Sequence, residues 1–250
     1  LIRNAAERLE VGSSQLAKAL NDITEQLENY RLQQIEQSAT AAKIKTKLLT
    51  EEETKQAKDF LSEPNLMSRT TEAIGKSGVT GEEYNRILMY IIFTSRKLHH
   101  PLHIVSLGSS AAGKTHLQEK VSELIPDEDK LEITSLSENA FYYFGQRELS
   151  HKLILIEDLE GAMNVLFPLR ELQSKKRITK TVTFKDTRGI TKTITLTVEG
   201  PVSVAGCTTR ERIYEDNANR SFLIYLDESE AQSKAIMNYQ KALSAGKINT

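Results

Sequence analysis

The spacing of apolar residues separates a helical N-terminal region from a region in which strands and helices alternate. Within residues 1–37, apolar side chains recur every seven residues, and a second set follows the first by four. This heptad spacing predicts a helix that is either a coiled coil, as an arm between domains, or an amphipathic helix packed on its own domain. A Gly-Ser-Ser run at 12–14 interrupts the first heptad. The heptad residues are Leu9, Leu16, Ile23 and Tyr30, with Leu20 and Leu27 interleaved.

Shorter helices are expected after a polar, linker-like segment at 38–50. Thr50 precedes three glutamates, which is typical of a helix N-cap, and Pro64 ends the helix that follows. Two more helices are predicted, at about 65–75 and 82–98, the latter with apolar residues at helical spacing.

From residue 101 the pattern changes to short apolar runs separated by helical segments. Because parallel strands need a crossover that is usually a helix, this alternation predicts a mainly parallel sheet covered on both faces. Residues 178–184 and 190–198 instead alternate apolar residues with threonines around a turn sequence, which predicts a β-hairpin with one buried face. The apolar strands are expected at 102–107, 153–156, 202–206 and 222–226, and the helices near 114–124 and 162–174.

Composition is that of a globular chain of 250 residues, enough for a helical region over 1–80 and one α/β domain over 81–250. The formal net charge of −1 means that nucleic-acid binding would need a local basic patch.

The single cysteine, Cys207, excludes an internal disulfide and fits a reducing, cytoplasmic location. No apolar run reaches the ~18 residues of a membrane span, so no membrane partner is expected. The chain begins without Met, which indicates a fragment of a longer protein.

A glycine-rich run lies between the first predicted apolar strand and the next helix, and it matches the phosphate-binding P-loop pattern. Its small residues let backbone N–H groups surround phosphates, and the helix adds the positive end of its dipole. Lys114 is expected to contact the β- and γ-phosphates and Thr115 to bind Mg²⁺, which predicts an ATPase with ATP and Mg²⁺ as cofactors. The run, called the phosphate loop below, is Gly108, Ser109, Ser110, Ala111, Ala112, Gly113, Lys114 and Thr115, and His116 follows it.

A pair of carboxylates follows the apolar strand at 153–156. In P-loop enzymes such residues bind Mg²⁺ and orient the attacking water. Glu157 and Asp158 are the candidates for both roles, with Glu160 as a third. Hydrolytic ring ATPases usually have Asp before Glu, and the reversed order here leaves the division of roles open. Slow hydrolysis, a switch that only binds nucleotide, and a merely solvated strand end are the alternatives.

The predicted hairpin is strongly basic, because residues 175–192 contain seven Lys or Arg and one Asp. Such a hairpin suits the backbone phosphates of DNA or RNA, with Lys180, Lys185, Arg188 and Lys192 as the candidate contacts. The threonine face has no aromatic residue on which a base could stack, so contact with the backbone and not with bases is expected. The alternative is a solvated edge hairpin kept soluble by its lysines.

Two further polar positions are candidates for catalysis. The strand at 202–206 runs into Thr208 and Thr209, and a hydroxyl placed there can sense the γ-phosphate; Thr208 is the first choice. Arg220 stands just before the last strand, where an arginine inserted into a neighbouring subunit's site would stabilise transition-state charge. Arg210 and Arg212 are alternatives, and ordinary surface residues are the competing interpretation at each position.

The order of these features resembles the AAA+ ATPases, and within them the hairpin-bearing branch of MCM-like helicases. A closer likeness, over about residues 80–240, is to the ATPase region of large bacterial primase-like proteins of phages and mobile elements. The residues that carry this likeness are Ser109-Ser110-Ala111-Ala112-Gly113-Lys114, Phe141-Tyr142-Tyr143-Phe144, His151-Lys152-Leu153, Glu160-Gly161-Ala162, Leu169-Arg170-Glu171-Leu172-Gln173-Ser174, Val198-Glu199-Gly200-Pro201, Thr208-Thr209, Asn219-Arg220 and Asp227-Glu228-Ser229.

The resemblance implies a three-layer αβα AAA+ core with a mainly parallel sheet, a hairpin insertion and an incomplete helical lid. It also implies an ATP-hydrolysing motor that acts on single-stranded or forked DNA as a homo-oligomeric ring, as a helicase in the replication of a mobile element. Two alternatives stay open at this point. One is a protein-remodelling or loader ATPase, and the other is a nucleotide-dependent switch or scaffold.

Overall fold

The computed structural model divides the chain into two units, residues 1–47 and 48–250. In the first unit only isolated positions between 8 and 30 are described, and most of them are helical, as the heptad spacing predicts. Of the described heptad side chains, Leu16 is half-buried and Leu20, Ile23, Leu27 and Tyr30 are exposed, and their pairing in a coiled coil stays a prediction. In the second unit the described residues are 48–137, 139–162, 165–185, 191–210 and 218–248, without the side chains at 184 and 185.

Three helices open the second unit. Thr50 caps the first of them through a capping box, since its hydroxyl accepts from the Glu53 N–H at 3.2 Å while the Glu53 carboxylate accepts from the Thr50 N–H at 2.9 Å. The N-cap predicted at Thr50 is therefore confirmed. The last of the three ends four residues earlier than expected, at Thr94, and continues as one 3₁₀ turn. The elements are α3 (Glu51–Ser62), α4 (Leu66–Lys76), α5 (Glu83–Thr94) and η1 (Ser95–Lys97).

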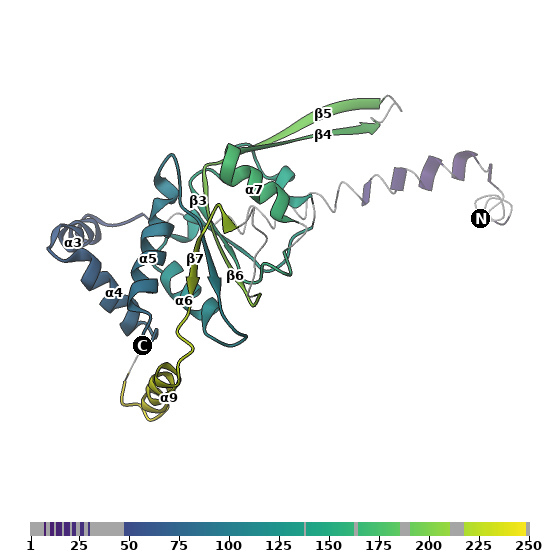
Figure 1. Ribbon diagram of the computed structural model, residues 1–250. Helices are drawn as coiled ribbons and strands as arrows, with labels where there is room; N and C mark the ends of the chain where they lie inside the picture. Colours follow the sequence, from purple (N-terminus) through teal and green to yellow (C-terminus); the bar gives the residue numbers. More distant parts are fainter. Residues whose placement is uncertain are drawn as a thin grey trace. The chain divides into compact units, whose positions relative to one another are not determined.

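A five-stranded parallel sheet forms the centre of the unit, in the order β2-β3-β6-β1-β7 (Figure 1). Alternate residues of β3 face opposite layers, which fixes the three-layer arrangement. Leu153 and Leu155 belong to the core that α5 and α6 cover, and Ile154 and Ile156 belong to the core under α7. The predicted parallel sheet with both faces covered is thus confirmed. The elements are β1 (Ile104–Leu107), α6 (Lys114–Ser122), β2 (Lys130–Ile133), β3 (Lys152–Ile156), α7 (Leu166–Lys175), β6 (Val202–Thr208) and β7 (Phe222–Tyr225).

The predicted hairpin is present as β4 (Arg177–Lys185) and β5 (Thr191–Glu199), paired antiparallel from Arg177↔Glu199 to Lys185↔Thr191. The predicted buried face is correct only at its base, where Ile178 and Val198 are buried. Ile194, farther along the same face, is 44% exposed. The reason is that α7 and the 3₁₀ turn η3 (Ala140–Tyr143) contact the base, and the outer part extends away from the sheet (Figure 1).

Two elements were not predicted from the sequence. β2 is an edge strand whose four residues, Lys130–Ile133, are half polar and only partly buried, so it lacks an apolar run. Helix α9 (Glu230–Ser244) follows β7 and begins at Ser229, whose hydroxyl accepts from the Gln232 N–H at 3.2 Å. No helix within the described residues combines the length and the apolar character that crossing a bilayer requires.

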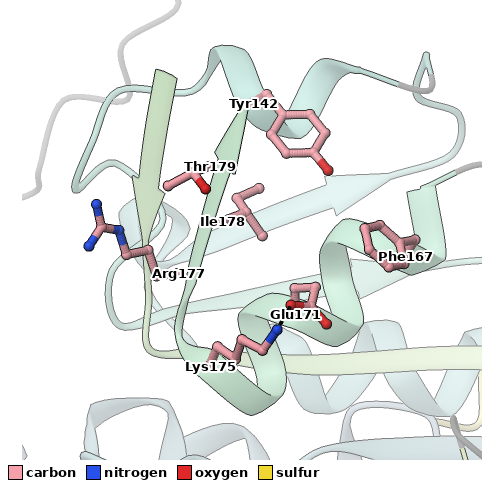
Figure 2. Close-up of a pocket in the computed structure, with 7 residues that line it drawn as sticks. All are labelled: Tyr142, Phe167, Glu171, Lys175, Arg177, Ile178 and Thr179. Atoms are coloured by element: carbon pink, nitrogen blue, oxygen red, sulfur yellow. Dashed lines mark ion pairs between the residues drawn. The ribbon is translucent and has the colours of Figure 1, made fainter. Parts of the chain in front are cut away.

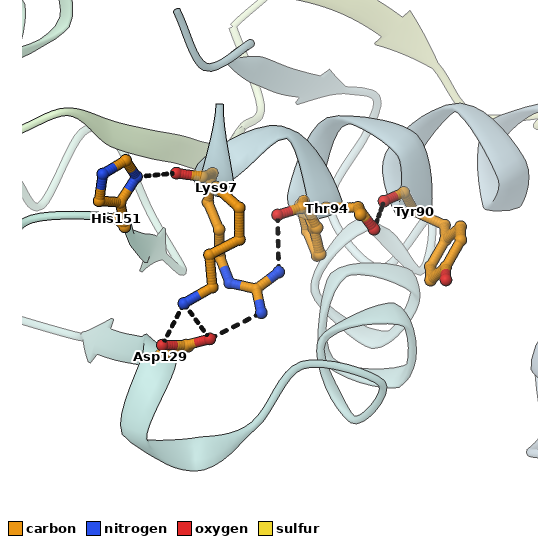
Figure 3. A network of polar contacts seen from close by, with 7 residues as sticks. Tyr90, Thr94, Lys97, Asp129 and His151 are labelled. Carbon is orange, nitrogen blue, oxygen red and sulfur yellow. Dashed lines mark hydrogen bonds and ion pairs between the residues drawn. The ribbon is translucent and has the colours of Figure 1, made fainter. Parts of the chain in front are cut away.

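A polar network joins the end of α5 to the edge of the sheet (Figure 3). Asp129, in the 3₁₀ turn before β2, accepts from Arg96 at 2.8 Å and from Lys97 at 2.8 Å. Burial by itself raises the pKa of Asp129, but these hydrogen bonds and the two positive charges outweigh it and lower the pKa. The Arg96 carbonyl also contacts His151 Nδ1 at 3.0 Å, just before β3. The network therefore joins the end of α5 to the edge strand β2 and to the start of its neighbour β3.

The buried His103 makes the stability of the sheet depend on pH. Its Nδ1 accepts from the Val204 N–H at 3.2 Å, and burial lowers its pKa to about 4. In the unfolded chain the histidine pKa is near 6.5, so between about pH 6.5 and pH 4 the unfolded chain binds a proton at this residue and the folded chain does not. The free energy of unfolding therefore falls as the pH drops through this interval. Over this pH interval we expect His103 to lower the free energy of unfolding by on the order of 2–3 kcal/mol.

Urea unfolding at pH 7 and pH 4.5 measures this contribution. His103→Gln keeps an acceptor for the Val204 N–H but does not titrate, so the variant should lose less stability than the wild type over the same interval. Equal losses in the two proteins would show that His103 is not the titrating group.

Candidate nucleotide-binding site

The phosphate loop connects the end of β1 to the start of α6, as the sequence predicts. Gly113 is the residue before the helix and has φ of 91°, a left-handed conformation that favours glycine. Ala111 has φ of 67°, which is uncommon for a residue with a Cβ and is typical of functional loops. Lys114 lies back across the loop, with its Nζ 2.8 Å from the Gly108 carbonyl and 2.5 Å from the Ser109 carbonyl. Its ammonium is thus held inside the curve of the loop.

One backbone amide of the phosphate loop already binds an anionic group of the same chain. The Ser109 N–H donates to Glu228 Oε1 at 2.6 Å. The hydrogen bonds from Ser109, aided by the charge of Lys114, lower the pKa of the Glu228 carboxyl. Sequence reasoning gave Glu228 no role, because nothing local indicates that the segment after β7 returns to the loop. The Ser109 amide therefore points to a position that a carboxylate oxygen occupies and that a phosphate oxygen would suit equally.

The two carboxylates after β3 differ in their surroundings. Asp158 binds its own turn, with Oδ1 accepting from the Glu160 N–H at 3.0 Å and Oδ2 from the Gly161 N–H at 3.2 Å. The carboxylate of Glu157 is exposed, and no hydrogen bond to it occurs among the described residues. Glu157 is therefore the carboxylate that is open to a metal ion, and Asp158 shapes the turn that presents it.

Thr115, Cys207 and Asp158 lie close together where β6 separates the phosphate loop from the acidic turn. The Cys207 thiol is buried, and burial raises its pKa to about 11, although a hydrogen bond with Thr115 and the charge of Lys114 oppose the shift; Asp158 adds to it. Cys207 is therefore a neutral, small buried residue, as expected from the sequence.

The residues that could hold Mg²⁺ are Thr115 and the carboxylates after β3. Within the part of the chain that the structure describes, no three His, Cys, Asp or Glu side chains form a metal site on their own. Proteins usually bind Mg²⁺ through one or two side chains together with substrate phosphates and water.

The polar end of β6 forms a cluster around Glu160. Thr208 is buried and donates to Glu160 Oε1 at 2.5 Å, while Thr209 donates to Oε2 at 3.3 Å. Arg210 contacts the same carboxylate at 3.4 Å. Thr208 pairs with Leu107, the last residue before the phosphate loop. The structure therefore brings Thr208, Thr209, Arg210 and the third carboxylate candidate together, between the loop and the acidic turn.

A cavity of about 250 Å³ beside the phosphate loop is the part of the site that sequence reasoning missed. The loop before α5 forms one wall and α9 another, and Gln232 joins them by donating to the Thr80 carbonyl at 2.7 Å. Gly81 permits this approach, since a Cβ there would lie 2.3 Å from Gln232 Oε1. His116, expected at the cofactor site, is in the lining, and its Nε2 lies 3.2 Å from the Gly78 carbonyl. The rest of the lining includes Val79, Leu117, Leu226, Ile236 and Tyr239.

Arg220 lies away from the phosphate loop of its own chain. It precedes β7, and β7 runs parallel to β1. The start of β7 therefore lies at the opposite end of the sheet from the carboxyl end of β1, where the phosphate loop begins. Its Nε donates to Ser174 Oγ, near the end of α7, at 2.8 Å. The alternative Arg212 lies outside the described residues. Arg220 therefore does not contact the phosphate loop of its own subunit.

The structure describes the side chains of two of the four basic hairpin residues, Lys180 and Lys192. Lys180 donates to Asn139 Oδ1 and lies over the Tyr142 ring, with its Nζ 5.3 Å from the ring centroid. Lys192 is exposed on β5. Arg188 and the side chain of Lys185 lie outside the described part of the chain, so their roles stay predictions.

Comparison with known protein families gives one match. Residues 49–250 match a family model described as the MTBMA_p00010 P-loop domain. The matched range includes α3 to α5, the phosphate loop, the hairpin and α9. A search of curated proteins found no match.

The contact between Glu228 and Ser109 should compete with a bound nucleotide. We expect Glu228→Gln to tighten ATP binding by about 3- to 10-fold, because the substitution removes a negative charge that repels phosphate and holds a loop amide. Titration of a fluorescent ATP analogue measures the effect. Glu230→Gln is the matched control, since Glu230 is paired with Lys234 on α9, 2.6 Å away, and not with the loop. Unchanged or weaker binding by Glu228→Gln would contradict the expectation.

Proposed function

The chain belongs to the MTBMA_p00010 P-loop domain family. Beyond what the family shows, we propose that it is an ATP-hydrolysing motor that acts on DNA as a homo-oligomeric ring. The P-loop domain itself is that of a nucleotide-binding NTPase with an α/β fold. The observation that carries the proposal is the arrangement around β6, which puts Thr208 and Glu160 between the phosphate loop and Glu157.

ATP is the proposed nucleotide. The phosphate loop provides the Lys114 ammonium and an amide that binds a carboxylate in the free chain. The lining of the neighbouring 250 Å³ cavity mixes apolar side chains, which suit the faces of an aromatic base, with polar ones that suit its edge, among them Thr80, Glu82, His116 and Gln240. The loop and the cavity are contiguous, because Ala111, Ala112 and Gly113 line both. A nucleotide would therefore have its phosphates on the loop and its base between the segment before α5 and helix α9.

For hydrolysis we assign Mg²⁺ to Thr115 and the exposed Glu157, with the nucleotide phosphates completing the coordination. Asp158 holds the turn that presents Glu157. Glu160 and Thr208 share a short hydrogen bond next to this position, and we assign to them the roles of orienting the attacking water and sensing the γ-phosphate.

Arg220 is the proposed arginine finger, and in that role it would act on the site of a neighbouring subunit in a ring. It lies at the edge opposite the phosphate loop of its own chain, so it can only reach the loop of another subunit. An arginine supplied to a neighbouring site stabilises the charge that develops on the transferred phosphoryl group.

DNA is the proposed substrate because of the basic hairpin. β4 and β5 extend from the sheet and have Lys180 and Lys192 on them (Figure 1). Among the described residues, no other element covers the outer part of these two strands. Together with the sheet order, in which β6 separates β1 from β3, this hairpin supports the AAA+ assignment, its MCM-like hairpin branch and the likeness to primase-like proteins of mobile elements.

A nucleotide-dependent switch is the second candidate. Asp158 is engaged in its own turn and Glu228 occupies a loop amide, and both features favour slow turnover. A protein-remodelling ATPase, the third possibility considered from the sequence, predicts that the basic hairpin can be neutralised without effect.

Steady-state ATP hydrolysis with and without single-stranded DNA tests the proposal. We expect turnover to rise with DNA and to fall at least about 100-fold in Lys114→Ala, which removes the charge that stabilises the transferred phosphate. Replacing Lys180, Lys185, Arg188 and Lys192 by Gln should abolish the stimulation and leave basal turnover intact.

The other outcomes separate the alternatives. Turnover that is indifferent to DNA and to the hairpin lysines would favour protein remodelling. ATP binding without turnover would favour the switch.

Mixing two inactive variants tests the position of Arg220. Arg220→Ala keeps its phosphate loop and Lys114→Ala keeps its arginine. In a ring with the finger in trans, an equimolar mixture should therefore regain about a quarter of wild-type turnover, the fraction of interfaces with both groups intact. Because neither variant has both groups, an arginine acting in cis would give no recovery. Arg220→Ala that hydrolyses ATP normally within the ring would exclude the role altogether.

A further inference from the structure

A further cavity lies at the base of the hairpin, away from the nucleotide site. It measures about 580 Å³, within the range of ordinary ligand pockets. α7, η3 and the first residues of β4 form its walls. Figure 2 shows Tyr142 and Phe167 on two sides of it, with Ile178 between them. Phe167 is 59% exposed, a high value for a phenylalanine within a folded unit.

Two cations lie over these aromatic rings, because Lys180 Nζ is 5.3 Å from the Tyr142 ring centroid and Arg170 Cζ is 5.9 Å from the Phe167 ring centroid. Lys175 and Arg177 are also in the lining, and the guanidinium of Arg177 points away from the rings (Figure 2). The only carboxylate in the lining is Glu171, which pairs with Lys175 at 2.6 Å (Figure 2). The immediate surroundings therefore carry a net positive charge.

Two aromatic faces next to lysine and arginine suit a base with its backbone phosphates. Bases stack on aromatic side chains in proteins that bind single strands, while cations follow the phosphates. A duplex base is stacked within the helix, so the ligand must be single-stranded. The cavity is also continuous with the basic hairpin, because Arg177, Ile178 and Thr179 belong to both.

We propose that this cavity, the base pocket, holds one base of a single DNA strand that runs along the hairpin. The base lies against Phe167 and Tyr142, and its flanking phosphates lie near Lys175, Arg177 and Lys180. This inference rests on the proposed action on DNA and adds a contact with bases to it. It also revises the expectation of backbone contact alone, because the aromatic rings come from η3 and α7 and not from the threonine face of the hairpin.

Fluorescence anisotropy with two labelled oligonucleotides tests the base pocket. One is a thymidine 20-mer and the other an abasic 20-mer of the same charge, both measured with the 250-residue chain, Mg²⁺ and a non-hydrolysable ATP analogue. We expect the wild type to bind the thymidine strand about 5- to 30-fold more tightly, the effect of stacking one base. Phe167→Ala should lose most of this preference. Because Phe167 is exposed, its replacement leaves the core intact.

Two controls separate stacking from other effects. Tyr143→Ala removes a neighbouring aromatic that is 66% exposed and outside the lining, and it should bind like the wild type. The salt dependence of binding should be the same for Phe167→Ala and the wild type, because no phosphate contact is lost. Neutralising Lys180 and Lys192 should instead reduce the salt dependence and leave the base preference in place.

Each outcome has a distinct meaning. A base preference that disappears in Phe167→Ala and persists in Tyr143→Ala supports the base pocket. Equal binding of both strands by the wild type overturns the base pocket and leaves the proposed action on DNA standing. Binding of neither strand overturns both.

Discussion

The parallel pairing of β1, β6 and β3 is the constraint on which the nucleotide site depends. Leu107 pairs with Thr208, and Ile156 pairs with Gly206, so the phosphate loop, the polar end of β6 and the acidic turn leave the sheet at the same edge. Seven buried residues of β6 hold this strand between the other two. The spacing of the functional groups is thus set by backbone hydrogen bonds in the interior, which neither solvent nor loop motion can readily alter.

The same edge is also limited by packing. Gly206 lies against Leu159 of the acidic turn, and a Cβ at Gly206 would lie 2.7 Å from Leu159 Cδ2. The Leu159 N–H donates to the Cys207 carbonyl at 2.9 Å, which attaches the turn to β6 directly. The carboxylates that follow β3 are therefore fixed relative to Thr208 by contacts on both sides, and Asp158 stabilises the turn from within. Buried apolar contacts and backbone hydrogen bonds together place the polar groups.

Features that depend on neighbouring residues in the sequence could be predicted, and features assembled from distant segments could not. The phosphate loop, the strand before it and the Thr50 cap each have a local pattern of a few residues. The cavity beside the loop is closed by a bond between Gln232 and Thr80, which are 152 positions apart, and Glu228 is 119 positions from Ser109. The alternation in the hairpin predicted its strands correctly, but whether a face is buried depends on what packs against it. Likewise, the aromatic side chains of the base pocket come from η3 and α7, and nothing in the hairpin sequence indicates them.

One connected segment supplies both Glu228, which contacts the loop, and Gln232, which closes the cavity beside it. Ser229 caps α9 between them, so this stretch is short and its first helical turn is fixed. A phosphate that takes the Ser109 amide must displace the Glu228 side chain, which stands two residues before the helix that forms a wall of the cavity. The phosphate-facing amide of the loop and the wall of the neighbouring cavity are thus joined through one short stretch of chain, residues 228–232.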